Sequence, residues 1–97
     1  MDTQWYISSS FELIDEYKNE VMAALQDLVM ETRKEPGCVS YILTQDRENP
    51  RKCMFLEVWE DEAAFRAHTT SVHLKRFKEI VEGKRTPVAL LKLQQIL

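Results

Sequence analysis

One stretch of the chain indicates its fold most clearly, the segment Phe55–His68 with the sequence FLEVWEDEAAFRAH. Its first part ends an alternating run, residues 52–59, whose side chains point in turn to the two faces of a β-strand. Both faces are apolar, with Met54, Leu56 and Val58 on one and Cys53, Phe55 and Trp59 on the other. The run therefore predicts a strand that is shielded from water on both sides.

The second part of this segment predicts a helix that follows the strand directly. Asp61 is suited to begin it, since an aspartate can accept hydrogen bonds from the amides of a first helical turn. Phe65 and His68 then fall on one side of that helix. A histidine on the apolar side of a helix is sheltered from bulk water, and this makes it the first residue to consider for chemistry.

A strand with two apolar faces also predicts how the chain assembles. The helices of a small antiparallel sheet can cover only one of its faces, and an exposed second apolar face would promote aggregation. A second copy of the chain, packed sheet to sheet about a twofold axis, would cover it. We therefore expect a homodimer.

The same kinds of pattern predict the other strands and helices, before and after this segment. We expect one domain, residues 1–97, with the order β-α-β-β-α-β of a ferredoxin-like α+β fold. Asp15 is expected to cap the first helix and Ser71 the third, and Gly37 to supply a left-handed turn after the first. Val39, Tyr41 and Leu43 are expected to share one side of the second strand. The expected strands are residues 5–13, 38–44, 52–59 and 88–97, and the expected helices are 16–34, 61–68 and 72–82.

Composition excludes several functional classes. The chain has 97 residues, of which 44% are hydrophobic and 30% charged, and its net charge is −3 without a basic stripe, which argues against nucleic-acid binding. The beginning lacks the pattern of a secretion signal, and no apolar run is long enough to cross a membrane, so we expect a cytoplasmic protein. Cys38 and Cys53 are expected to be reduced, packed thiols.

His68 and Glu57 are the candidates for acid–base chemistry. Histidine exchanges a proton near neutral pH, although His68 could also be a core residue that bonds one backbone carbonyl. Glu57 lies between Phe55 and Trp59, where a carboxylate is costly to bury unless it is paired or protonated. It is either a structural partner of an Arg or Lys, which we favour, or a tuned acid or base.

Aromatic side chains could form the walls of a pocket around these groups. Tyr41, Phe55, Trp59 and Phe65 could stack on a flat aromatic ligand, or could simply be core. His73 could face solvent or the same cavity. We expect no metal site, because His68 and His73 are five residues apart on a broken helix and no acidic residue stands at helical spacing on a continuous face.

The chain closely resembles the antibiotic-biosynthesis monooxygenase-like (ABM) family over nearly its whole length. The resemblance is carried by Glu35–Cys38, Tyr41, Phe55–His68 and Ser71–Leu74. It implies a dimeric α/β barrel of two ferredoxin-like subunits, each with a pocket between its sheet and its helices. Members of the family include oxygenases that need no cofactor and act on quinol-like or polyketide aromatics, haem-degrading enzymes, and an isomerase of autoinducer-2 breakdown.

Departures from one branch of the family narrow the expected activity. Where this chain has His68, Lys78 and Ser8–Ser10, the haem-degrading branch has a tryptophan, a second histidine and an asparagine, so haem degradation is disfavoured. The resemblance then implies an enzyme without metal or organic cofactor that uses His68 as a base and oxygenates a small quinol or phenol with dioxygen.

Two other readings of the sequence stay open. One is an isomerase of a small phosphorylated keto compound, with Lys52, Arg51 or Lys75 as the phosphate's cation. The other is a non-catalytic dimeric ligand-binding protein in which His68 is structural.

Overall fold

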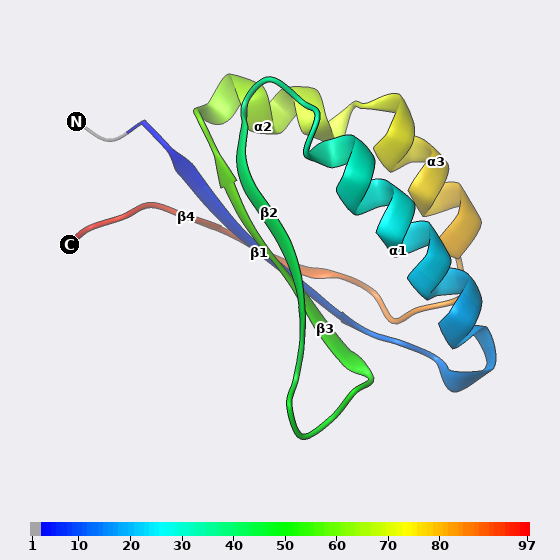
Figure 1. Cartoon of the computed structure of the whole chain (residues 1–97). Helices are drawn as coiled ribbons and strands as arrows, with labels where there is room; N and C mark the ends of the chain where they lie inside the picture. The colour runs from blue at the N-terminus through cyan, green and yellow to red at the C-terminus, as the bar shows by residue number, and fades with distance from the viewer. Residues whose placement is uncertain (1–2) are drawn as a thin grey trace.

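A computed structural model of the chain describes residues 3–97 and confirms the predicted ferredoxin-like order of elements (Figure 1). The second helical region is divided into two helices, α2 and α3, at Thr70 and Ser71. The elements are β1 (Trp5–Glu12), the short 3-10 helix η1 (Asp15–Tyr17), α1 (Lys18–Thr32), β2 (Cys38–Gln45), β3 (Lys52–Trp59), α2 (Glu62–Thr69), α3 (Val72–Val81) and β4 (Ala89–Leu93).

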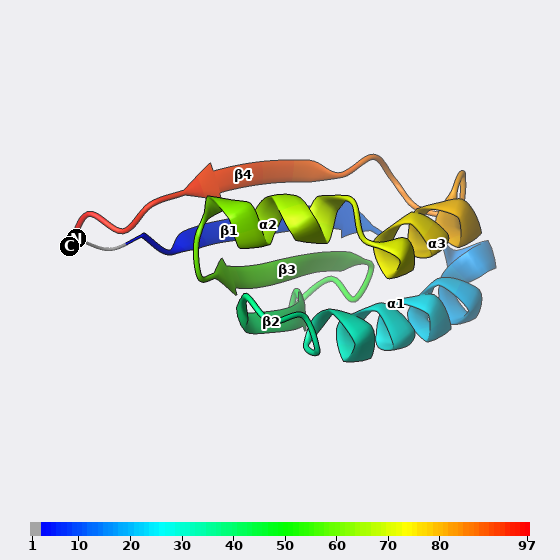
Figure 2. The same ribbon diagram turned by 90° about the horizontal axis from the view of Figure 1, so that it is seen from above.

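The four strands form one antiparallel sheet in the order β2-β3-β1-β4. All three α-helices lie on the same face of the sheet, as Figure 2 shows from above. Glu57 occupies a central place on this face, because it lies opposite Ile7 of β1 on one side and opposite Tyr41 of β2 on the other. The sheet therefore presents Glu57 to the space beneath the helices.

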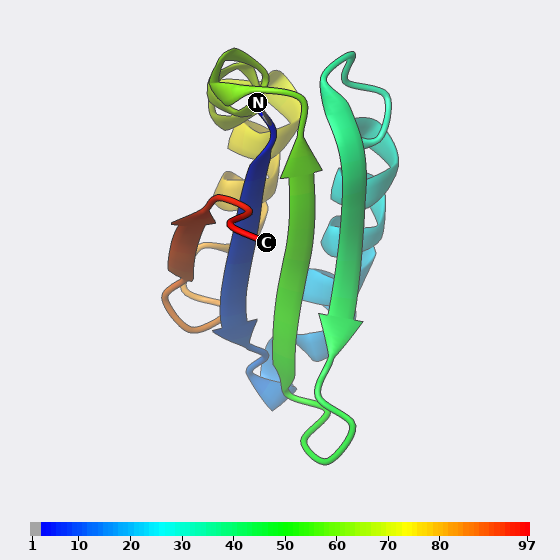
Figure 3. The ribbon, with the colours of Figure 1, turned by 90° about the vertical axis from the view of Figure 1, so that its left-hand side faces the viewer.

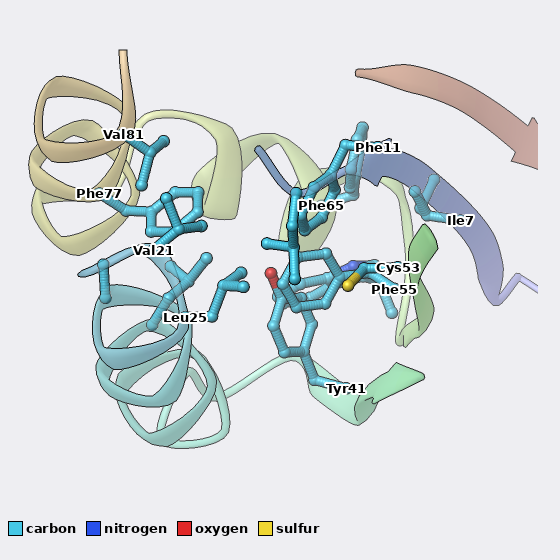
Figure 4. Packing of buried hydrophobic residues seen from close by; sticks show 14 residues of the cluster. Ile7, Phe11, Val21, Leu25, Tyr41, Cys53, Phe55, Phe65, Phe77 and Val81 are labelled. Carbon is cyan, nitrogen blue, oxygen red and sulfur yellow. The ribbon is translucent and has the colours of Figure 1, made fainter. Parts of the chain in front are cut away.

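The core fills the layer between the sheet and the helices (Figure 4). Phe11, Tyr41, Phe55 and Phe65 cluster close to the sheet, and a second group from α1 and α3 packs where these two helices meet. That second group is Val21, Leu25, Phe77 and Val81. Burying an aliphatic or aromatic side chain of this size contributes about 1.5–3 kcal/mol, so this layer dominates the stability of the fold.

Two of the three predicted caps are confirmed. The Asp61 carboxylate accepts from the amide of Ala64 (2.8 Å), and the Ser71 hydroxyl accepts from that of Leu74 (3.3 Å). The prediction for Asp15 was wrong. Because a 3-10 turn precedes α1, Asp15 lies inside that turn and its carboxylate pairs with Arg51 instead.

The two glycines have different roles. Gly83 ends α3 with a φ of 72°, a conformation that costs other residues free energy. Gly37 does not have a positive φ, so the predicted left-handed turn at this position was wrong. Gly37 is instead required by a close approach, because a Cβ atom there would lie 2.2 Å from the Cβ of Ala64 in α2.

The start of β2 also differs from its predicted alternation. The register shifts between Cys38 and Ser40, as in a β-bulge, and Val39 is 54% exposed rather than directed inward with Tyr41. Cys38 comes to lie opposite Trp59 and packs against the core. Simple alternation could not predict this, because a bulge inserts one residue that breaks the period of two.

The other face of the sheet carries no helix, and Figure 3 looks onto it. The large apolar side chains on this open face are exposed, so the chain itself does not cover the second apolar face of β3 that was predicted to be shielded. They are Ile42 on β2, Met54 and Leu56 on β3, and Leu91 and Leu93 on β4. Within residues 3–97, no helix has both the length and the apolar character needed to cross a bilayer.

Candidate functional site

A cavity of about 290 Å³ lies between the inner face of the sheet and helices α2 and α3. Five of the seven residues predicted for the site line it, and these are Tyr41, Phe55, Glu57, Phe65 and His68. Trp59 is completely buried behind this lining and does not reach the cavity. His73 does not line the cavity either and lies at a small hollow between α1 and α3. The volume suits a molecule of one or two rings.

Aromatic rings form one wall of this cavity. Tyr41 packs against Phe55 with ring centroids 4.9 Å apart, and the edge of His68 meets Tyr41 at 5.5 Å. Burial raises the pKa of the Tyr41 phenol above its usual 10, and the charge of Glu57 acts in the same direction. Tyr41 is therefore a neutral wall residue that can donate a hydrogen bond and does not act as a base.

The strongest polar contact beside the cavity joins His68 to Glu35. His68 is 4% exposed on the last turn of α2, and its Nδ1 lies 2.7 Å from Oε2 of Glu35, in the turn after α1. The two residues are 33 positions apart, and the Gly37–Ala64 contact brings their two segments together. Sequence reasoning assigned Glu35 only to the end of a helix and missed this role.

His73 shares the same carboxylate. Its Nε2 lies 2.7 Å from the same Oε2 atom, with the side chain 20% exposed in the first turn of α3. A carboxylate oxygen can only accept, so each of the two facing ring nitrogens carries a hydrogen. A neutral His68 is then the Nδ1–H tautomer, and its bare Nε2 is the nitrogen left for a molecule in the cavity.

The surroundings keep His68 neutral near physiological pH. Burial lowers the pKa of its imidazole below the ordinary 6.5, and Glu35 offsets part of this effect. The charges of His73 and Lys78 act in the same direction as burial. His68 is thus a sheltered base whose orientation is fixed by a carboxylate, an arrangement suited to taking a proton from a bound substrate.

Glu57 has a partner other than the predicted Arg or Lys. Its Oε1 accepts from Nε1 of Trp59 at 2.9 Å, and within residues 3–97 no cation lies within ion-pair distance of it. Burial raises its pKa to about 7; the Trp59 hydrogen bond opposes this rise and the charge of Glu35 adds to it. Glu57 is therefore a partly protonated acid at neutral pH. This agrees with the second of its two predicted roles, an acid or base whose pKa is shifted by its surroundings.

Replacing Glu57 by glutamine should stabilise the protein at alkaline pH. The folded-state pKa is raised from 4.5 to about 7, so the stability that protonated Glu57 contributes is fully present below 4.5 and is lost as pH rises through 7. The wild type should lose about 3 kcal/mol over this window relative to Glu57→Gln, at about 1.36 kcal/mol per pKa unit. Glutamine keeps an oxygen acceptor for Trp59.

Urea unfolding of both proteins at pH values from 4 to 9 measures this difference. The exposed Glu48→Gln is the control and should follow the wild type. A constant offset between Glu57→Gln and the wild type across the window would show that the Glu57 pKa is not raised by folding.

Glu35, His68 and His73 are also residue types that bind metal ions. One ligand atom of each lies within 4.8 Å of the others. No metal site was predicted from the sequence, because only acidic residues at helical spacing from His68 and His73 were considered. Glu35 lies in the turn between α1 and β2 and falls outside that spacing. In the present arrangement one carboxylate oxygen accepts a hydrogen from each ring, so a metal ion bound here would displace both of those protons.

Two cations at the cavity were not predicted. Lys78 and Arg85 line it, whereas the three cations proposed from the sequence lie elsewhere. Arg51 pairs with Asp15, Lys52 lies at the end of the sheet, and Lys75 lies on the outer side of α3. Arg85 falls between the expected helix 72–82 and the expected strand 88–97, so no sequence signal marked it as a cavity residue.

Comparisons with known proteins agree with this fold. A family model described as "Antibiotic biosynthesis monooxygenase" matches residues 7–80. The uncharacterized protein YjcS of Bacillus subtilis is 36% identical over 69 residues, which cover 70% of this chain and 66% of YjcS, just under two thirds of its length. YcnE of the same organism, provisionally named a monooxygenase, is 32% identical over 69 residues, covering 71% of this chain and 70% of YcnE.

A solved structure extends the likeness to the whole chain. PA3566 from Pseudomonas aeruginosa superposes with a TM-score of 0.91 at 27% identity and covers 100% of this chain and 98% of its own. The fold is therefore shared along the full length.

Proposed function

The chain belongs to the antibiotic biosynthesis monooxygenase family, and on that premise we propose that it oxygenates a small quinol or phenol, with His68 as the base. The observation that carries the proposal is the orientation of His68. Glu35 holds its Nδ1–H, which leaves Nε2 available to a molecule in a cavity walled by aromatic rings. A base fixed in this way contributes about 10²–10⁴-fold to a proton transfer.

The reaction can proceed with electrons from the substrate alone. Nε2 takes the proton of a substrate hydroxyl, and the resulting phenolate passes one electron to dioxygen. The substrate radical and superoxide then join at a ring carbon that bears hydrogen, and the protonated His68 supplies the proton of the hydroperoxide. Loss of that carbon's hydrogen and cleavage of the O–O bond give a quinone and water, so that phenol plus dioxygen equals quinone plus water.

The walls of the cavity support this chemistry in two ways. Tyr41, Phe55 and Phe65 offer ring faces and edges against which a flat substrate can pack. They also keep water away from the radical pair and from the phenolate, whose charge is felt more strongly by nearby groups in a dry site.

Oxygen uptake with a panel of quinols and phenols tests the proposal. For an active substrate we expect one dioxygen consumed per substrate, and one labelled oxygen atom in the quinone when ¹⁸O₂ is supplied. The rate should survive dialysis against a chelator. Saturable binding without oxygen uptake by any member of the panel would count against an oxygenase and would favour the ligand-binding reading.

A second candidate is favoured by one observation, the two cations Lys78 and Arg85 at the cavity. An isomerase of a small phosphorylated keto compound would use the same base to move a proton between carbons and would need such charges for its phosphate. The two functions differ in their need for dioxygen. Isomerisation should continue under nitrogen, whereas oxygenation should stop.

We also propose that the protein is a homodimer that packs through the open face of the sheet. The support is the row of exposed apolar side chains on that face, which includes Ile42, Leu56 and Leu91. Exposed apolar surface of this kind favours a partner surface of the same character.

Placing a charge in the centre of this face should separate the dimer. We expect light scattering after size exclusion to give twice the chain mass for the wild type and a single chain mass for Leu56→Glu. Lys18→Glu, an exposed change on α1 away from this face, is the control. A monomeric wild type at micromolar concentration, or a dimer that tolerates Leu56→Glu, would contradict this assembly.

A further inference from the structure

Arg85 is a cation without an anion at the inner end of the cavity. Across residues 3–97, no carboxylate lies within 4.0 Å of its guanidinium, and its Nε is buried without a hydrogen-bond partner. A buried donor left unpaired costs about 1–3 kcal/mol, so this position is unfavourable unless something else accepts from it. Burial also lowers the pKa of the Arg85 side chain.

The backbone holds Arg85 firmly in this place. Residue 85 forms an antiparallel bridge with Leu13, beyond the end of β1. Next to it, the Thr86 amide donates to the Glu12 carbonyl (3.0 Å), and the Thr86 hydroxyl accepts from the Glu12 amide (2.7 Å). The backbone at Arg85 is therefore held beside the end of β1, and its side chain lines the cavity.

Two aromatic rings flank the guanidinium without neutralising it. Its central carbon lies 5.1 Å from the Phe11 ring centroid and 5.4 Å from that of Phe77. Such contacts orient the planar group and stabilise its charge in part. They act through the ring faces, so the N–H donors of the guanidinium edge remain available to a planar acceptor.

The other charges at the cavity complete the pattern. Lys78 lines the same cavity from an exposed position on α3, has no ion-pair partner within residues 3–97, and influences His68 through its charge. Among the described residues, Glu57 is the one acidic side chain in the lining, and its carboxyl group accepts a hydrogen bond from Trp59. The cavity lining thus combines two acid–base groups, His68 and Glu57, with two cations, Arg85 and Lys78.

We propose that Arg85 and Lys78 form an anion subsite and that the substrate is an aromatic acid, a hydroxylated ring that carries a carboxylate. This inference rests on the proposed function and narrows its substrate class. A carboxylate matches the planar fork of the guanidinium, which can donate two parallel hydrogen bonds to it. Binding there would anchor the ring and direct its hydroxyl group toward the imidazole of His68.

Binding of a matched pair of probes under nitrogen tests the subsite. The probes are 2,5-dihydroxybenzoate and its uncharged methyl ester, measured by calorimetry. We expect the wild type to bind the acid at least tenfold more tightly than the ester. Arg85→Gln should weaken binding of the acid by 10–100-fold and binding of the ester by less than threefold. Arg85→Lys should retain part of the preference for the acid. The control is Arg76→Gln, which lies on α3 outside the cavity lining.

Equal affinities of the wild type for the two probes, no measurable binding of the acid, or an acid preference that survives in Arg85→Gln would overturn the subsite. If Arg85→Gln does not fold, the exposed Lys78→Gln decides instead. A three- to tenfold loss of affinity for the acid alone supports the subsite, and equal changes in affinity for both probes overturn it.

This experiment separates the subsite from the proposed function, because anaerobic binding requires no turnover. An acid preference without oxygen uptake would retain the subsite and remove the oxygenase. Oxygen uptake with neutral quinols, without tighter binding of the acid, would retain the oxygenase and remove the subsite.

Discussion

Replacing His68 by glutamine should lower kcat for oxygen uptake by about 10²–10⁴-fold, the range that a positioned general base contributes. Glutamine can still donate to Glu35 but has no nitrogen that accepts a proton. Because glutamine can keep the hydrogen bond to Glu35, we expect the variant to stay folded, which its urea unfolding curve checks. An unchanged rate would remove His68 from the mechanism.

Two variants around His68 separate its chemistry from its position. His73→Gln keeps the cavity lining intact and should cost less than about tenfold, because His73 does not line the cavity. Glu35→Gln should cost about 10–100-fold, because a glutamine amide can donate to Nδ1 and so favour the tautomer whose Nε2 is already protonated. Where activity remains, the acidic limb of kcat/KM should move to lower pH, since Glu35 raises the His68 pKa. A merely structural Glu35 would leave that limb in place.

Replacing Gly37 by alanine should destabilise the protein by about 3 kcal/mol, the upper end of the usual cost of overpacking. The new Cβ would lie 2.2 Å from the Ala64 Cβ and 3.4 Å from its Cα, so neither a rotamer change nor a small side-chain shift relieves the clash. The segment would have to move away from α2. Urea unfolding measures the loss.

A compensating change tests whether this contact is the cause. Ala64→Gly removes the clashing atom and alone should cost about 1 kcal/mol, because glycine is a poor helix residue. In the double variant, Gly37→Ala should then cost under about 1 kcal/mol beyond that, which is a coupling between the two sites. Additive costs would mean that Gly37 is required for another reason.

Local patterns predicted most of the fold. Alternation in β3 and the caps Asp61 and Ser71 depend on neighbours in sequence, and all three agree with the structure. The failures have local causes too. A bulge at Val39 broke the alternation, and a 3-10 turn moved Asp15 away from the start of α1.

The candidate site was predictable only in part. The periodicity of α2 and β3 placed His68, Phe55 and Glu57 on sides that face one cavity. Glu35 and Arg85 could not be found in this way, because their roles depend on contacts between segments distant in sequence. The close approach of Gly37 to Ala64 brings Glu35 near α2, and a bridge to Leu13 positions Arg85.

The central claim is that His68 is a neutral base with its proton on Nδ1 and a bare Nε2. Long-range ¹H–¹⁵N correlation spectra of the labelled protein report the protonation state of each ring nitrogen, and the chain has only two histidines, which His68→Gln distinguishes. At neutral pH we predict Nδ1–H for His68, the opposite tautomer for His73, and a His68 pKa below 6.5. A protonated Nε2 on His68 at neutral pH, in either a neutral or a charged ring, would contradict the account.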